Sequence, residues 1–179
     1  RVVGLTLITG AMAETAVLTP ERAFPLPDNV SFEAGAGLLF NDLTVYFALT
    51  VRGRLAKGET VLVHGGAGGV GHVVVQLALA RGARVFATGS AAQSRVIEGF
   101  GAVAIDFMQS QPEDYVVAHT AGEGFDVVYD TVGGPVLDIS FGVVRRCTGR
   151  VVSCLGWGTH KLAPLSFRAA TYSGVFTLL

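Results

Sequence analysis

Short apolar runs alternate with longer amphipathic segments over most of the chain. Residues 61–63 read Val-Leu-Val, and similar runs rich in β-branched and aromatic side chains lie at residues 84–87, 103–107, 125–129, 149–155 and 172–179. Helical patterns separate them, the first ending at residue 80 and the others covering residues 93–100, 113–120 and 135–145. Apolar strands spaced by helices predict βαβ units with right-handed crossovers. We therefore expect an α/β fold with a doubly wound Rossmann sheet of about six parallel strands.

Two short strands are expected at the start of the chain, over residues 1–8 and 13–18, with a turn at Gly10 between them. The prolines between residues 19 and 27 favour extended, turn-like backbone, because each removes a hydrogen-bond donor and restricts the residue before it. This region therefore predicts a little β structure before the sheet.

Two helices are expected between this region and the sheet. Ser31 is a good N-cap for a short helix over residues 32–39. Asp42 is a candidate cap for a longer helix over residues 43–55.

A glycine-rich turn follows the strand at residues 61–63. Gly66, Gly68 and Gly71 fit the G-x-G-x-x-G pattern, between a predicted strand and a predicted helix. The first glycine would allow the tight turn, the second the approach of a pyrophosphate, and the third close packing of helix on strand. The helix that follows would offer its N–H groups and positive dipole end to phosphates. The turn predicts a dinucleotide site, and the alternative is a turn with a structural role only.

Composition and charge narrow the classes of function. The 179 residues are 50% hydrophobic and 15% charged, which indicates one extensively buried core. The net charge of −1 and the lack of basic runs argue against nucleic acid as a partner. The longest apolar stretch, around residues 70–80, is too short to span a bilayer, so no membrane partner is expected. No signal peptide is visible and the two cysteines have no disulfide or zinc spacing, so cytoplasmic localisation is the default expectation.

The segment after the second strand of the sheet bears on the choice of cofactor. An acidic residue there would bind the ribose 2′-hydroxyl and favour NAD, but residues 87–90 read Ala-Thr-Gly-Ser. Ser90, Ser94 and Arg95 offer hydroxyls and a guanidinium that suit a 2′-phosphate, so we expect NADPH, with NADH still possible. An ordinary solvated helix charge is an equally good interpretation of Arg95.

Polar and small residues follow the fourth and fifth strands, at residues 130–134 and 154–158. Ligands of open α/β sheets bind in the crevice outside the carboxyl ends of the strands, so both segments are predicted to line it. Asp130 has a second interpretation, as the cap of the helix that opens at Pro135.

Four other kinds of site do not fit the sequence. A Walker A loop needs Gly-Lys-Ser/Thr, whereas Gly71 is followed by His72 and Val73. No tyrosine has a lysine four residues later, as in short-chain reductases, and no G-x-S-x-G elbow is present. The four histidines are scattered without a carboxylate or cysteine at ligand spacing, so no metal site is expected.

A set of motifs extends over nearly the whole chain. They are Ala13-Glu14, Leu26-Pro27, residues 31–39, Leu43-Thr44-Val45-Tyr46, residues 58–63, Ala67-Gly68-Gly69-Val70-Gly71 and residues 126–133. Together they resemble the medium-chain dehydrogenase/reductase superfamily, most of all its zinc-independent, quinone-oxidoreductase-like branch. By that resemblance residues 1–34 are a remnant of a GroES-like catalytic domain and residues 35–179 are the Rossmann cofactor domain. The chain would then begin near the end of the first segment of that catalytic domain.

The resemblance also implies roles for individual residues. Thr44 would approach the nicotinamide, residues 66–71 would hold the pyrophosphate, and residues 154–157 would flank the nicotinamide ribose. Phe40 stands where zinc-dependent relatives have a cysteine ligand, so zinc is disfavoured. With the crevice segments included, the predicted cofactor-binding residues are Thr44, Gly66, Ala67, Gly68, Gly69, Val70, Gly71, Thr88, Gly89, Ser90, Arg95, Asp130, Thr131, Val132, Cys154, Leu155, Gly156 and Trp157.

Two functions follow from this sequence. The first is an NADPH-dependent oxidoreductase that transfers hydride to a quinone, an enone or a related activated carbonyl compound without zinc. The alternative is a nucleotide-binding structural or partner-binding protein without turnover. The last predicted strand is an apolar sheet edge with no lysine or proline to blunt it, so we also expect a homodimer through residues 174–178.

Overall fold

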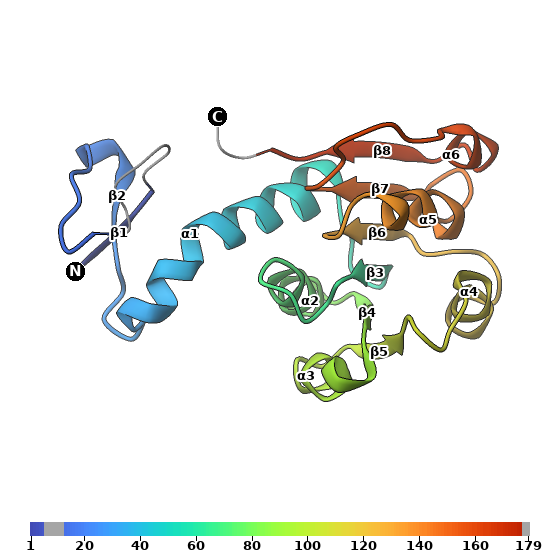
Figure 1. The fold of residues 1–179 in the computed structure, drawn as a ribbon, viewed down its shortest axis with the longest axis horizontal. Helices are drawn as coiled ribbons and strands as arrows, with labels where there is room; N and C mark the ends of the chain where they lie inside the picture. The colour runs from blue at the N-terminus through green and yellow to red at the C-terminus, as the bar shows by residue number, and fades with distance from the viewer. Residues whose placement is uncertain (6–12, 177–179) are drawn as a thin grey trace.

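The computed structural model describes residues 1–5 and 13–176 (Figure 1). Its strands are β1 (Val2–Gly4), β2 (Ala23–Pro25), β3 (Thr60–His64), β4 (Arg84–Gly89), β5 (Val103–Asp106), β6 (Val127–Asp130), β7 (Arg150–Ser153) and β8 (Thr171–Gly174). Its α-helices are α1 (Phe32–Phe47), α2 (Gly71–Ala80), α3 (Ser94–Gly99), α4 (Pro112–Thr120), α5 (Pro135–Val143) and α6 (Ala163–Phe167). Three shorter helical segments are η1 (Pro20–Arg22), the π-helical η2 (Ala48–Arg52) and η3 (Ala91–Gln93).

The large sheet has six strands in the order β5-β4-β3-β6-β7-β8, and every neighbouring pair is parallel. The chain moves outward from β3 to β4 and β5, then returns to place β6 on the other side of β3. This is the strand order of a Rossmann sheet, and it confirms the predicted fold class. The reversal puts a topological switch point between β3 and β6, where ligands of such sheets bind.

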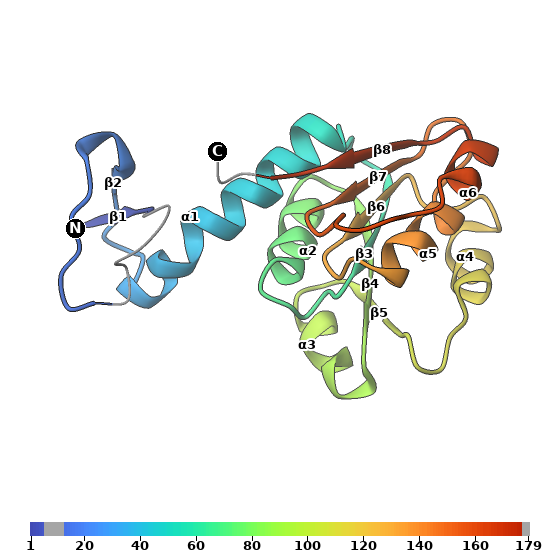
Figure 2. The same ribbon diagram turned by 45° about the horizontal axis from the view of Figure 1, so that its top comes forward.

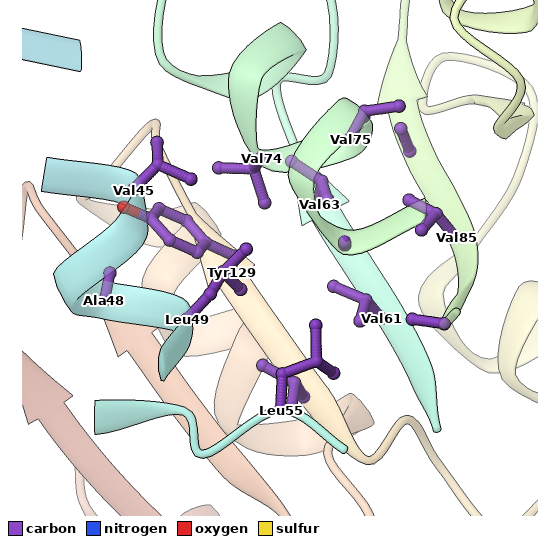
Figure 3. Close-up of a cluster of buried hydrophobic side chains, with 14 of the residues drawn as sticks. Val45, Ala48, Leu49, Leu55, Val61, Val63, Val74, Val75, Val85 and Tyr129 are labelled. Atoms are coloured by element: carbon purple, nitrogen blue, oxygen red, sulfur yellow. The ribbon is translucent and has the colours of Figure 1, made fainter. Parts of the chain in front are cut away.

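Each face of the sheet is covered by its own group of helices. Helices α1, α2 and α3 lie on one side of the strands and α4, α5 and α6 on the other (Figure 1). Alternate side chains of each strand point to opposite faces, so Val61 and Val63 join the first layer while Leu62 joins the second. Figure 3 shows the first layer, in which Tyr129 of β6 packs against Leu49 of η2.

The N-terminal β structure is a two-stranded antiparallel sheet of β1 and β2. It lies at the far end of α1 from the large sheet (Figure 2). The predicted strand over residues 13–18 is wrong: this segment is irregular and mostly exposed, and the partner of β1 is β2. The end of the predicted strand over residues 1–8 and the turn at Gly10 lie outside the described residues. So do residues 177–179, which include the end of the last predicted strand and of the segment expected to form the homodimer.

One helix replaces the two that were expected before the sheet. Ser31 caps it as predicted, since its hydroxyl accepts a hydrogen bond from the N–H of Ala34 at 3.1 Å. The helix then continues through Asp42, which is therefore not an N-cap, and passes directly into η2. It stays continuous because its last turns are packed in the hydrophobic core, where Val45 and Leu49 have no exposed surface.

By length and apolar composition, the combined helix Phe32–Arg52 could cross a membrane. It is longer than residues 70–80, the longest apolar stretch identified in the sequence. Its packing on the sheet accounts for the apolar residues of its C-terminal half. The predicted domain boundary after residue 34 falls inside α1, and the division into two domains stays a prediction.

Candidate functional site

The glycine-rich turn joins β3 to α2 at the carboxyl edge of the sheet. Two of its glycines are required by the fold itself: a Cβ on Gly66 would lie 2.5 Å from the Cβ of Ala87, and one on Gly71 would overlap the carbonyl oxygen of Gly65. Gly68 is different, because its Cβ would meet only that oxygen, at 3.3 Å. Internal packing therefore explains the first and third glycines, and leaves the exposed Gly68 open to a molecule that approaches from outside.

Backbone donors are open in this turn. The N–H groups of Ala67, Gly69 and Val70 donate to no backbone carbonyl within the described chain. They lie in the turn that leads into α2, whose N-terminus has no side-chain cap. Because the first N–H groups of a helix carry the positive end of its dipole, the turn has the donors and the field that a diphosphate requires.

The end of β4 lies beside the turn. Thr88 Oγ1 accepts a hydrogen bond from the N–H of Gly65 at 3.2 Å, so this hydroxyl fixes the start of the turn. Ser90 opens η3, and its N–H donates to Oε1 of Gln93 at 2.9 Å. Arg95 is exposed on α3 and has no ion pair within the part of the chain that the structure describes. Its guanidinium is available to a phosphate, but no neighbouring group orients it.

Residues that follow β6 lie across the switch point from the glycine turn. Thr131 Oγ1 donates to the carbonyl oxygen of His64 at 2.6 Å and so ties the end of β6 to the end of β3. Asp130 is fully buried, and its carboxylate accepts hydrogen bonds from the next turn and from Ser153. The alternative that Asp130 caps α5 is wrong, because the N-cap is Gly134 and no side chain caps that helix.

The loop of residues 154–157 follows β7 and packs on the loop after β6. A Cβ on Gly133 would lie 2.5 Å from the carbonyl oxygen of Leu155, so the two loops touch through their backbones. Burial raises the pKa of the Cys154 thiol, which therefore stays protonated at neutral pH and is not activated as a nucleophile. Trp157 is largely exposed at the end of this loop.

Thr44 lies on α1, which passes close to the glycine turn. The amide nitrogen of Asn41 would lie 3.8 Å from a Cβ on Gly69, one helical turn before Thr44. Thr44 is buried and its hydroxyl donates to the carbonyl oxygen of Phe40 at 2.7 Å. Among the described residues no three histidine, cysteine or acidic side chains cluster as a metal site, and independence from zinc stays a prediction.

A cavity of about 300 Å³ opens at the carboxyl edge, on the face covered by α4 and α5. Its lining residues are His64, Gly65, Thr88, Gly89, Gln93, Phe107, Ser110, Gln111, Pro112, Tyr115, Val132, Val136 and Ile139. His64 is almost fully buried there, and burial lowers its pKa to about 4, so the imidazole is neutral at pH 7. Phe107, Ser110 and Gln111 were missed as candidates, although their position just after β5 is the signal that could have found them.

A second hollow, of about 780 Å³, lies between α1 and α2 and was also missed. Asn41, Asp42 and Tyr46 line it from α1, and His72 and Gln76 from α2. Burial raises the pKa of Asp42, and the nearby His72 opposes that shift. This hollow flanks the glycine turn, so its polar groups border the candidate site.

The structure thus brings most of the predicted residues to one edge. The switch point is surrounded by the glycine turn, Thr88, residues 131–132 and the loop of residues 154–157. Arg95 lies at the periphery of this edge, and Thr44 lies on the neighbouring helix α1.

Comparison with known proteins gives the family. Residues 69–177 match the zinc-binding dehydrogenase family. An alcohol dehydrogenase superfamily protein from Novosphingobium aromaticivorans is 54% identical, with a TM-score of 0.84 over 88% of this chain and 47% of that protein. The quinone oxidoreductase from Thermus thermophilus, solved also with NADPH, is 29% identical, with a TM-score of 0.85 over 98% of this chain and 56% of that one. The CurK enoyl reductase is 29% identical, with a TM-score of 0.77 over 88% of this chain and 48% of its own.

The chain therefore spans about half the length of these solved structures. Curated relatives that are polyketide synthases match over only 5 to 7% of their length.

Proposed function

The chain belongs to the zinc-binding dehydrogenase family, within the medium-chain dehydrogenase/reductase superfamily, and on that premise we propose that it binds NADPH for hydride transfer to a quinone, an enone or a related activated carbonyl compound. The observation that carries the proposal is the glycine turn at the switch point, with open N–H groups and an exposed Gly68 that internal packing does not require. Similarity to a quinone oxidoreductase and to an enoyl reductase supports the substrate class.

The residues present fit a nicotinamide dinucleotide. Residues 66–71 would bind the diphosphate through backbone N–H groups, and Ser90 and Arg95 would face the 2′-phosphate. Residues 131–132 and the loop of residues 154–157 would border the nicotinamide end. The cofactor supplies the hydride, so the task of these residues is to hold and orient it and to exclude water.

A direct test is fluorescence titration of the protein with NADPH and with NADH, followed by cofactor oxidation in the presence of quinones and enones. We expect NADPH to bind about tenfold or more tightly than NADH, since a charge-assisted hydrogen bond contributes on the order of 1.5–3 kcal/mol. Equal affinities would refute the choice of NADPH. Tight NADPH binding without turnover of any such compound by the intact protein would favour the nucleotide-binding alternative.

A further inference from the structure

Asp130 is a buried carboxylate without a cation. It has no exposed surface, and no lysine, arginine or histidine forms an ion pair with it in the described structure. Hydrogen bonds compensate its charge instead. The N–H of Val132 donates to Oδ1 at 3.0 Å, the N–H of Gly133 to both oxygens at 3.0 and 3.1 Å, and Ser153 Oγ to Oδ2 at 2.7 Å. Burying a charge costs free energy, so the position of this carboxylate indicates a role beyond packing.

These bonds fix the first residues of two loops at once. The bonds from Val132 and Gly133 set the turn after β6, and the bond from Ser153 sets the end of β7. Ser153 Oγ in turn accepts a hydrogen bond from the N–H of Leu155 at 3.1 Å, which carries the constraint into the loop of residues 154–157. One carboxylate therefore links the two loops that border the switch point.

Further hydrogen bonds link the residue next to Asp130 to the glycine turn. Thr131, next to Asp130, donates to the carbonyl oxygen of His64 at 2.6 Å, and the following N–H, of Gly65, donates to Thr88. The carboxylate thus lies behind the rim of the crevice rather than in it, with both oxygens already occupied by protein donors.

We propose that Asp130 is a positioning residue: through Ser153 and the turn after β6, it holds the loop of residues 154–157 at the distance from the glycine turn that the nicotinamide end of the cofactor requires. The inference rests on the proposed function. It assigns to Asp130 an action through the two loops rather than a contact with the cofactor.

The test compares two ligands that differ only in the nicotinamide end, NADPH and 2′-phospho-ADP-ribose. In Asp130→Ala we expect NADPH to bind about tenfold more weakly, with the affinity for the fragment changed less than about twofold. Asp130→Asn should largely restore NADPH binding, because its amide oxygen can still accept from the turn and its amide nitrogen can donate to Ser153. Ser153→Ala should have a smaller effect of the same kind.

Asp126 provides a control at the opposite end of β6. Its carboxylate is also buried and accepts from the N–H of Thr60 at 2.8 Å and from its hydroxyl at 2.7 Å, far from the carboxyl edge. Unlike Asp130, it also forms an ion pair with Arg145 at 3.0 Å. Asp126→Ala should lower the thermal midpoint without changing the ratio of the two affinities.

Trp157 gives a readout without any ligand, because it is the single tryptophan and lies in the loop concerned. Its emission or quenching by acrylamide should change in Asp130→Ala and not in Asp126→Ala. If Asp130→Ala does not fold, Ser153→Ala decides by the same measurements.

Equal weakening of both ligands in Asp130→Ala, or an unchanged NADPH affinity, would overturn the positioning role while leaving the proposed function intact. Failure of the wild-type protein to bind either ligand would overturn the proposed function, and the cofactor role of Asp130 with it.

Discussion

His64 makes the stability of this protein depend on pH in a defined range. The side chain is 4% exposed at the end of β3, its Nδ1 lies 3.3 Å from Thr88 Oγ1, and its Nε2 has no hydrogen-bond partner among the described residues. Burial lowers its pKa from 6.5 to about 4, although the neighbouring Asp130 acts in the opposite direction. The folded protein therefore keeps this imidazole neutral where an unfolded chain would protonate it.

The sign and size of the effect follow from that difference. Between pH 6.5 and about 4 the unfolded chain binds more protons than the folded protein does. The contribution of the neutral His64 to the free energy of unfolding is therefore complete above pH 6.5 and is lost as the pH falls through this window. Lowering a pKa from 6.5 to about 4 corresponds to about 3 kcal/mol in total, of which about 2 kcal/mol should be lost between pH 7 and pH 5.

Urea unfolding of the wild-type protein and of His64→Asn at pH 7 and pH 5 would measure this loss. The asparagine keeps a polar group near Thr88 but does not titrate, so the free energy of unfolding of the variant should depend less on pH, by about 2 kcal/mol over this interval. Taking the difference between the two proteins removes the pH dependence that they share. Equal pH dependence in both would show that His64 is not held neutral by burial and would refute the reasoning.

Three further predictions concern the cofactor and the sheet edge. Gly68→Ala should fold with a small shift of the carbonyl oxygen of Gly65, which would lie 3.3 Å from the new Cβ, but should weaken NADPH binding about tenfold. Unchanged affinity in titration would show that the diphosphate does not bind at this turn. Arg95→Ala should weaken NADPH about tenfold and leave NADH unaffected, and a parallel loss for both would exclude contact with the 2′-phosphate. For the proposed homodimer, Gly174→Pro should shift the mass measured by light scattering from that of a dimer to that of a monomer. The N–H of Val175 donates to the carbonyl oxygen of Ser153 within the sheet at 2.8 Å, so the N–H of Gly174 points away from β7, toward the open edge. An unchanged dimer would place the interface elsewhere.

Local patterns were enough to predict the sheet and its ligand edge. Strands β3 to β7 each contain a short apolar run, whereas β8 reads Thr-Tyr-Ser-Gly, and the turn between β3 and α2 is marked by the spacing of its glycines. The Ser31 cap is also local, since its hydroxyl bonds to an N–H three residues later. Signals of this kind depend on residues that are close together in the chain, so they can be recognised from the sequence alone.

Tertiary structure decided what depends on distant partners. Asp42 has the chemistry of an N-cap, but packing of Val45 and Leu49 against the sheet keeps α1 continuous through it. Residues 13–18 alternate like a strand but pair with no strand in the described chain, and backbone hydrogen bonds of a strand need such a partner. The burial of Asp130, and with it the link between the two loops, arises only where β6 and β7 end side by side. Val132 and Gly133 are near Asp130 in the chain, but Ser153 is 23 residues away, and only the pairing of β6 with β7 brings its hydroxyl to the carboxylate.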